Sequence, residues 1–294
     1  MSAQFLQFLF SGITVGATYA LAALGFTLIY NSSNVINFAQ GEFIMLGGML
    51  TVYFTGAGLP LPAAVALAIV IPAVVGMLVE KLAIEPAKGN NGGEVVSLII
   101  ITIGASLVIR GVIQVWLGKG TFAFDAFSGS APIEIGGATL MPQSLWVLGV
   151  TALIVVALWL FFSRSVAGKA ILATSCNPVA AQLVGINTQW VLLVSFALSA
   201  SMGAVGGILL TPLTMTSYDV GIMLGLKGFV AAVVGGLGSG LGAVAGGLLV
   251  GVVEAMAAGY ISSAYKDAVP FLLIFVILFF MPRGLFGAKL TDRV

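Results

Sequence analysis

The sequence predicts an all-α, polytopic membrane protein with eight or nine transmembrane segments. Of its 294 residues, 60% are hydrophobic and only 7% are charged, whereas about a quarter of the residues in soluble domains are charged. Apolar runs of about 20 residues recur along the chain, and a helix needs this length to cross the hydrocarbon core of a bilayer. We therefore expect residues 1–294 to form a single transmembrane domain.

The apolar segments follow one another with short polar breaks. They cover 5–30, 41–56, 60–80, 95–117, 143–162, 189–211, 222–237, 240–259 and 267–281. The first lacks a basic flank and is longer than a signal-peptide core, so we expect a retained helix. The glycine cluster "GGLGSGLG" at 235–242 predicts a tight turn at one surface or the tip of a re-entrant pair, because open backbone cannot face lipid.

The distribution of basic residues predicts an orientation. If all nine segments cross, three charged stretches share one side: 81–94, 163–188 and 282–294. They contain Lys81, Lys88, Arg164, Lys169, Arg283, Lys289 and Arg293, whereas the other side contains Lys119, Lys227 and Lys266. Basic residues favour cytoplasmic loops, so this bias favours a cytoplasmic C-terminus and an external N-terminus.

The polar composition excludes several classes of function. The net charge of +1 provides no basic surface for nucleic acid. Histidine is absent and Cys176 is the single cysteine, so we expect no metal site, no internal disulfide and no catalytic residue. The chain also lacks the G-x-x-x-x-G-K-[ST] phosphate-binding motif, so it is not predicted to hydrolyse ATP itself.

The cytoplasmic stretch 163–188 contains a short helix with signals at both ends. Asn177 suits the N-cap, Pro178 the first helical position and Gly185 the left-handed residue after the helix. The enclosed "PVAAQLV" spans about two turns, which are marginally stable in water without a packing partner. Its small apolar side chains favour docking into a groove on another protein over a place against its own bundle or in the lipid interface. They are Val179, Ala180, Ala181, Leu183 and Val184.

Four sequence blocks carry a family resemblance. They are "GKAILATSCNPVAAQLVGIN" (168–187), "NVINFAQGEFIMLGG" (34–48), "AAVVGGLGSGLGAVAGGLLVGVVE" (231–254) and "PRGLFG" (282–287). They resemble segments of the LivH-type permeases of ABC importers for branched-chain amino acids, follow one another along the chain in the order found in that family, and together span nearly the whole chain.

The resemblance implies a permease subunit in the bacterial inner membrane that works by alternating access. It implies as partners a second homologous permease, two ATP-binding cassette subunits that use ATP and Mg, and an extracytoplasmic solute-binding protein. The chain itself would bind no cofactor. The resemblance also makes the short helix in 163–188 the coupling helix, with Asn177, Pro178, Ala180, Ala181, Leu183 and Gly185 in contact with an ATPase.

Polar residues within the apolar segments are candidates for the translocation pathway, because charges in a membrane are costly and commonly functional. The candidates are Asn34, Asn37, Gln40, Glu42, Arg110 and Glu254. Glu42 is equally well explained as a first-turn glutamate favoured by the helix dipole. The neighbouring amides either bind a zwitterion or satisfy an unwound backbone.

Other intramembrane residues have expected structural roles. An ion pair of Arg110 with Glu254 or Glu42 is expected, because an unpaired buried charge is destabilising. Lys227 and Asp219 are expected to mark the outer boundary of the seventh segment. Small residues at helix-contact spacing predict close helix packing; they are Gly12 with Gly16, Gly242 with Gly246, and Gly247 with Gly251.

Two other mechanisms and several substrates remain open at this stage. An ion-coupled secondary transporter also uses broken helices, but the lack of histidine and the few intramembrane acids disfavour proton coupling; a channel-like facilitator is the third possibility. Branched-chain or other neutral amino acids are the first-ranked substrates. Urea, short amides and aromatic acids, which relatives in the wider family carry, come next.

Overall fold

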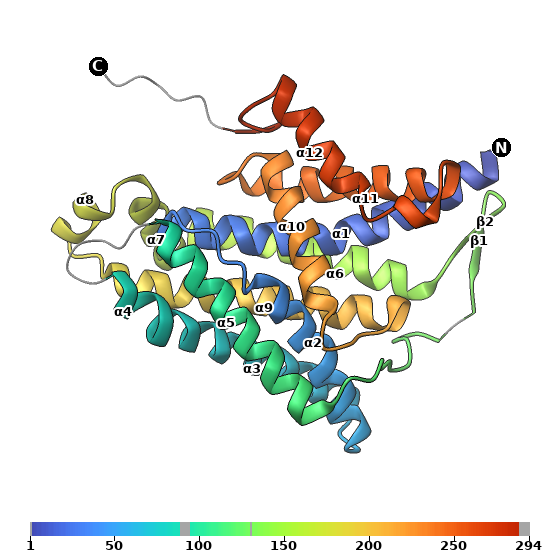
Figure 1. Cartoon of the computed structure of the whole chain (residues 1–294), viewed down its shortest axis with the longest axis horizontal. Coiled ribbons are helices and arrows are strands. Elements are labelled where there is room, and N and C mark those ends of the chain that lie inside the picture. The colour runs from blue at the N-terminus through green and yellow to red at the C-terminus, as the bar shows by residue number, and fades with distance from the viewer. Residues whose placement is uncertain (1, 89–94, 130, 288–294) are drawn as a thin grey trace.

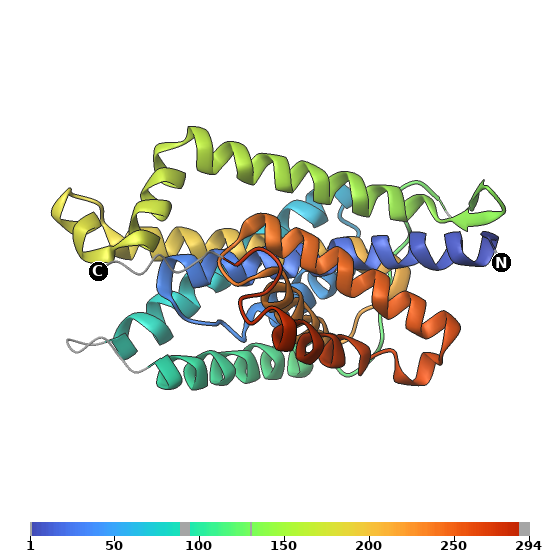
Figure 2. The same ribbon diagram turned by 90° about the horizontal axis from the view of Figure 1, so that it is seen from above.

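The computed structural model describes residues 2–88, 95–129 and 131–287, which form an elongated helical bundle (Figures 1 and 2). The first half of the bundle contains α1 (Ser2–Ser33), α2 (Gln40–Gly56), α3 (Leu61–Val79), the π-helical turn η1 (Glu80–Ile84), α4 (Glu85–Lys88) and α5 (Val95–Leu117). The second half contains α6 (Pro142–Arg164), α7 (Val166–Cys176), α8 (Pro178–Leu183), α9 (Thr188–Thr214), α10 (Val220–Gly235), α11 (Gly240–Tyr260), the 3-10 turn η2 (Ser263–Tyr265) and α12 (Val269–Phe280).

The two ends of the bundle differ in structure. The N-terminus lies beside a hairpin of β1 (Ile133–Ile135) and β2 (Ala138–Leu140), and we call this the hairpin end. The Gln7 side chain fastens α1 to the hairpin, because its Nε2 donates to the Thr139 carbonyl oxygen (3.0 Å) and its Oε1 accepts from the Thr139 N–H (2.7 Å). The opposite end, which we call the α8 end, carries α4, α7 and α8 (Figure 1).

Six helical stretches are long and apolar enough to cross a membrane, within the described residues: 3–33, 61–88, 95–117, 142–164, 188–214 and 240–260. Helices α2, α10 and α12 are apolar but shorter. The structure therefore confirms a polytopic all-α membrane protein, whereas the predicted count of eight or nine crossings is not established. Helices α4 and α8, from the predicted stretches 81–94 and 163–188, both lie at the end opposite the N-terminus. Residues 89–94 and 288–294 of the predicted cytoplasmic stretches lie outside the described residues.

Burial separates central helices from peripheral ones. In α1, 89% of the most apolar stretch is buried within the bundle, whereas the corresponding share of α6 is 11% and that of α5 is 17%. Helix α1 packs along α11, α9 and α10. We infer that the exposed apolar faces of α5 and α6 are directed at lipid or at another subunit, because water would disfavour so much apolar surface.

Small residues account for the close contact between α1 and α11. A Cβ atom added at Gly16 would lie 2.9 Å from the Gly247 carbonyl oxygen, and one added at Gly251 would overlap the backbone of Gly16. Two of the three glycine pairs identified in the sequence, Gly12 with Gly16 and Gly247 with Gly251, therefore meet each other across this interface. Backbones approach this closely only where both helices lack side chains.

The glycine cluster at 235–242 forms a turn between α10 and α11. Gly236 (φ +103°) and Gly238 (φ +94°) have positive φ values, which suit glycine. The C-terminal segment 282–287 packs on this turn, where Leu285 N–H donates to the Val234 carbonyl oxygen and Phe286 N–H to that of Gly235, both at 2.9 Å. These bonds satisfy carbonyl groups that the end of α10 leaves without helical partners.

Candidate functional site

The starts of α2 and α10 meet α5 around a cavity of about 190 Å³. Glu42, Ser106 and Arg110 contribute its polar lining, and Gly221 and Gly225 contribute backbone. Helix α2 begins inside the bundle because the chain unwinds after α1, and Glu42 occupies its first turn as predicted. Short helices that begin within a membrane protein commonly mark the transport path.

Glu42 is buried with one carboxylate oxygen unused. Glu42 is 1% exposed to solvent. The Ser106 hydroxyl donates to Glu42 Oε1 at 2.7 Å, whereas Glu42 Oε2 has no hydrogen-bond partner among the described residues. A buried polar atom without a partner is unusual and invites a functional explanation.

Arg110 lines the same cavity, one helical turn after Ser106 in α5. It is half-buried. Within the described residues, the ion pairs all involve Lys227, and no acidic side chain is paired with Arg110. The expected ion pair of Arg110 with Glu254 or Glu42 is therefore wrong: Glu42 is held by a hydroxyl, and Glu254 faces a different cation.

Glycine allows α2 and α10 to cross at the edge of the cavity. A Cβ atom added at Gly221 would lie 2.7 Å from the Gly41 carbonyl oxygen and 3.0 Å from Glu42 Oε2. One added at Gly225 would lie 2.8 Å from the Gly41 Cα. The unused oxygen of Glu42 therefore lies close to the α10 backbone, at a position that only glycine leaves open.

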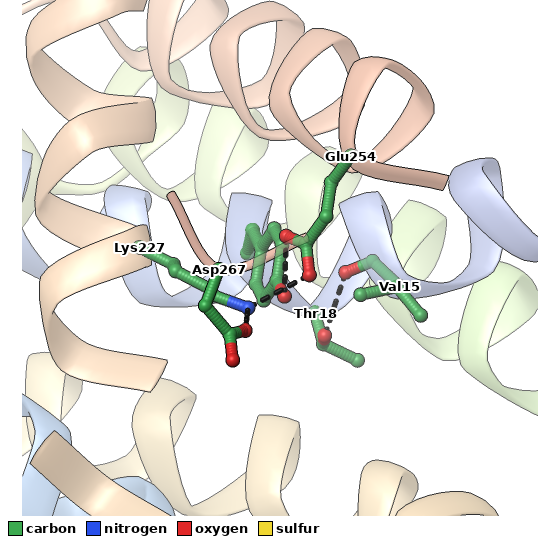
Figure 3. A network of polar contacts seen from close by, with 6 residues as sticks. Val15, Thr18, Lys227, Glu254 and Asp267 are labelled. Atoms are coloured by element: carbon green, nitrogen blue, oxygen red, sulfur yellow. Dashed lines mark hydrogen bonds and ion pairs between the residues drawn. The ribbon is translucent and has the colours of Figure 1, made fainter. Parts of the chain in front are cut away.

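Lys227 lies at the centre of a second polar cluster (Figure 3). Its Nζ is 2.7 Å from Glu254 Oε1 and 2.6 Å from Asp267 Oδ1, and the Tyr19 hydroxyl donates to Glu254 Oε2 at 3.0 Å. Lys227 is 5% exposed and lies in the middle of α10, so the expectation that it marks the outer boundary of this segment is wrong. The cluster connects α1, α10, α11 and the loop before α12.

Asp267 is the exposed member of this cluster. It lies outside the helices, between η2 and α12, and its side chain is 49% exposed. The hydrogen bond from Lys227 lowers the pKa of the Asp267 carboxyl, although partial burial opposes this effect. Asp267 therefore stays ionised at neutral pH, and it is the acidic partner of Lys227 that water reaches more easily.

The amides before α2 mainly satisfy protein groups. Asn34 is exposed at the end of α1 with a φ of 55°. Asn37 is buried, and its Oδ1 accepts from the Ala39 N–H at 3.0 Å. Gln40 exchanges hydrogen bonds with Ser199 of α9 at 3.1 and 2.6 Å. Of the two roles considered for these amides, Gln40 and the Asn37 oxygen therefore serve the protein's own structure.

The short helix at 178–183 forms with the predicted signals. The Ala180 N–H donates to Asn177 Oδ1 at 3.0 Å, Pro178 begins α8, and Gly185 has a φ of +86°. Leu183 is 84% exposed, whereas Ala181 is 3% exposed. Ala181 therefore packs inward and is not available for docking, and we correct that assignment; the free apolar surface comes from Val179, Leu183 and Val184.

The sequence did contain a signal for two residues that we assigned differently. Lys227 stands in an otherwise apolar stretch between Gly225 and Gly228, where a charge is expensive and calls for a buried partner. Ser106 was not among the pathway candidates, and it is the hydrogen-bond donor to Glu42. No signal within α10 or α11 reveals which acid Lys227 meets.

Comparison with known proteins identifies the family. A family model described as "Branched-chain amino acid transport system / permease component" matches residues 8–278. The chain belongs to this family. The high-affinity branched-chain amino acid transport system permease protein LivH of Salmonella typhimurium is 35% identical over 100% of both chains. The corresponding permease BraD of Pseudomonas aeruginosa is 33% identical over 99% of this chain and 98% of its own.

One further curated relative and one solved structure show weaker similarity. The probable LivH permease of Methanocaldococcus jannaschii is 29% identical over 91% of this chain and 88% of its own. The solved structure of PsaBC from Streptococcus pneumoniae in complex with Fab covers 96% of this chain and 97% of that one with 15% identity, at a TM-score of 0.49. The predicted family is confirmed: the chain is a permease subunit of an ABC importer, and ATP hydrolysis is the task of separate subunits.

Proposed function

We propose that this permease moves branched-chain or other neutral amino acids across the bacterial inner membrane by alternating access. The observation that carries the proposal is the likeness to LivH over the full length of both chains. The cavity supports it, because a carboxylate and a guanidinium in one apolar cavity match the two charges of an amino acid. Urea, short amides and aromatic acids are the alternative substrates.

We further propose that 163–188 is the cytoplasmic coupling loop and that α8 docks on an ATP-binding cassette subunit. The exposed side chains of Val179, Leu183 and Val184 offer an apolar surface at the extreme α8 end of the bundle. Asn177 and Gly185 hold the helix ends, so the surface is presented by a defined structure. ATP and Mg would be bound by the partner, and closure of the ATPases would move α8.

The complete importer would contain a second, homologous permease, two ATPase subunits and an extracytoplasmic solute-binding protein. The family membership supports this composition and favours ATP coupling over coupling to an ion gradient. The exposed apolar face of α5 gives room for a second membrane subunit beside the cavity. The hairpin end would then face the binding protein.

The proposal is tested by purification from the native membrane followed by reconstitution. We expect the tagged permease to co-purify with a second permease and with ATPase subunits, and we expect vesicles containing this complex and its binding protein to take up leucine only when ATP is supplied. A permease that purifies alone and transports without ATP would contradict the coupling. ATP-driven uptake of urea or an aromatic acid, but not of leucine, would contradict the substrate.

A further inference from the structure

We propose that Glu42 and Arg110 bind the two charged ends of a zwitterionic amino acid on its way through this permease. The ammonium group of the substrate would meet Glu42 Oε2, and its carboxylate would meet the guanidinium of Arg110. This inference rests on the proposed function, since it assigns a place within the permease to the proposed class of substrate.

Glu42 supplies an acceptor that the protein itself does not use. Its Oε1 accepts a hydrogen bond from Ser106, whereas its Oε2 has no partner among the described residues, although Glu42 is only 1% exposed. Burial of an ionised carboxylate is strongly disfavoured unless it is paired. A substrate ammonium group provides both the opposite charge and three hydrogen-bond donors.

Arg110 supplies the complementary group. A guanidinium presents a planar set of donors that matches a carboxylate in two parallel hydrogen bonds. Within the described residues Arg110 is committed to no acidic side chain, so its donors remain available in the cavity. A guanidinium at this place would otherwise be costly in a membrane protein.

The helix geometry places Arg110 on the same face of α5 as Ser106, the residue that holds Glu42. Ser106 precedes Arg110 by four residues in α5, so both project from one face of the helix, about 6 Å apart along its axis. The Ser106 hydroxyl holds Glu42 Oε1 at 2.7 Å, and within the described residues Glu42 forms no ion pair with Arg110, which lines the same cavity. They can therefore contact opposite ends of one small molecule rather than neutralise each other.

The rest of the cavity fits an aliphatic side chain. Ile103, Leu107 and Leu226 line it, and its volume of about 190 Å³ is below the range of about 300–1,000 Å³ that is usual for larger organic ligands. Leu107 is 56% exposed at the mouth. A mouth that leads to two charges is unsuited to hydrocarbon, so water or a neighbouring permease subunit must cover it.

Equilibrium binding of radiolabelled L-leucine to the purified importer complex, without its binding protein, tests the site. Leucinamide, which lacks the carboxylate, and isocaproate, which lacks the ammonium group, are used as competitors. We expect Glu42→Gln and Arg110→Gln each to weaken leucine binding about tenfold or more, the usual effect of losing a charged hydrogen bond. Glu134→Gln and Arg283→Gln, which change exposed residues outside the cavity, serve as matched controls.

The competitors separate a binding role from general damage. Arg110→Gln should bind leucine and leucinamide equally while it still rejects isocaproate, and Glu42→Gln should lose the preference over isocaproate while it still rejects leucinamide. If Glu42→Gln or Arg110→Gln keeps the wild-type affinity for leucine, or the wild-type preference for leucine over both competitors, the proposed site is wrong. Uptake of leucine by the wild-type complex without any leucine binding to the permease would overturn it as well. If wild-type vesicles take up no neutral amino acid, the proposed function itself fails.

Discussion

Lys227 Nζ lies 2.7 Å from Glu254 Oε1, so a buried ion pair joins the middle of α10 to the second half of α11. The two residues are separated by a glycine-rich turn, and the pair holds the two helices together within the bundle. Tyr19 adds a hydrogen bond from α1 to the same carboxylate. The cluster thus fixes α10, the helix that also borders the Glu42 cavity.

Removal of the lysine should destabilise the protein more than removal of either acid. Lys227→Met leaves the Glu254 carboxylate, whose side chain is 10% exposed, without its cation, and loss of one partner of a buried pair typically costs about 3–5 kcal/mol. Glu254→Gln should have a smaller effect, because Lys227 keeps Asp267. Thermal unfolding of the detergent-solubilised variants measures the order, and equal stability of Lys227→Met and the wild type would contradict it.

The Asp267 ion pair should stabilise the protein only above the pKa of its carboxyl. Lys227 lowers the pKa of Asp267 in the folded state below the value of about 3.9 in unfolded chains. The stabilisation is therefore present above that pH and is lost as the pH falls through the lower, folded-state pKa. The stability difference between wild type and Asp267→Asn, measured by thermal unfolding at a series of pH values, should shrink below about pH 4. A difference that stays constant down to pH 2 would argue against the pair.

Substitutions on the two sides of α8 should have different consequences. Leu183→Asp alters an exposed side chain, so we expect normal folding but loss of substrate-stimulated ATPase activity in the assembled importer. Ala181→Asp places a carboxylate at a buried position and should instead reduce the yield of folded permease. Size-exclusion profiles and ATPase assays distinguish the two effects. Full coupling in Leu183→Asp would exclude α8 as the docking helix.

The contact between α1 and α11 should tolerate no added methyl group. Gly251→Ala would place its Cβ atom on the Gly16 backbone, and overpacking of this kind typically costs about 1–3 kcal/mol. Gly111→Ala in α5 is the matched control, since nothing lies within 4 Å of an added Cβ atom there. The thermal unfolding temperature should fall for the first variant and not for the second.

The sequence by itself predicted the parts of the structure that depend on residues close together in the chain, such as helix ends and turns. The caps of α8 follow from Asn177, Pro178 and Gly185, because each acts on the backbone within a few residues. The glycine cluster predicted a turn or the tip of a re-entrant pair, and the four sequence blocks indicated the family that the comparisons confirm. Composition alone was sufficient to identify a membrane protein, because long apolar segments are incompatible with water.

Only the tertiary structure decided which distant residues meet. Arg110 and Glu254 had compatible charges, but α11 lies against α10 and presents Glu254 to Lys227. Ala181 and Leu183 belong to the same two turns, and the packing of α8 decided that Ala181 is buried while Leu183 stays exposed. Helix ends are determined by interactions over a few residues, whereas ion pairs and buried faces depend on which helices become neighbours in the folded bundle.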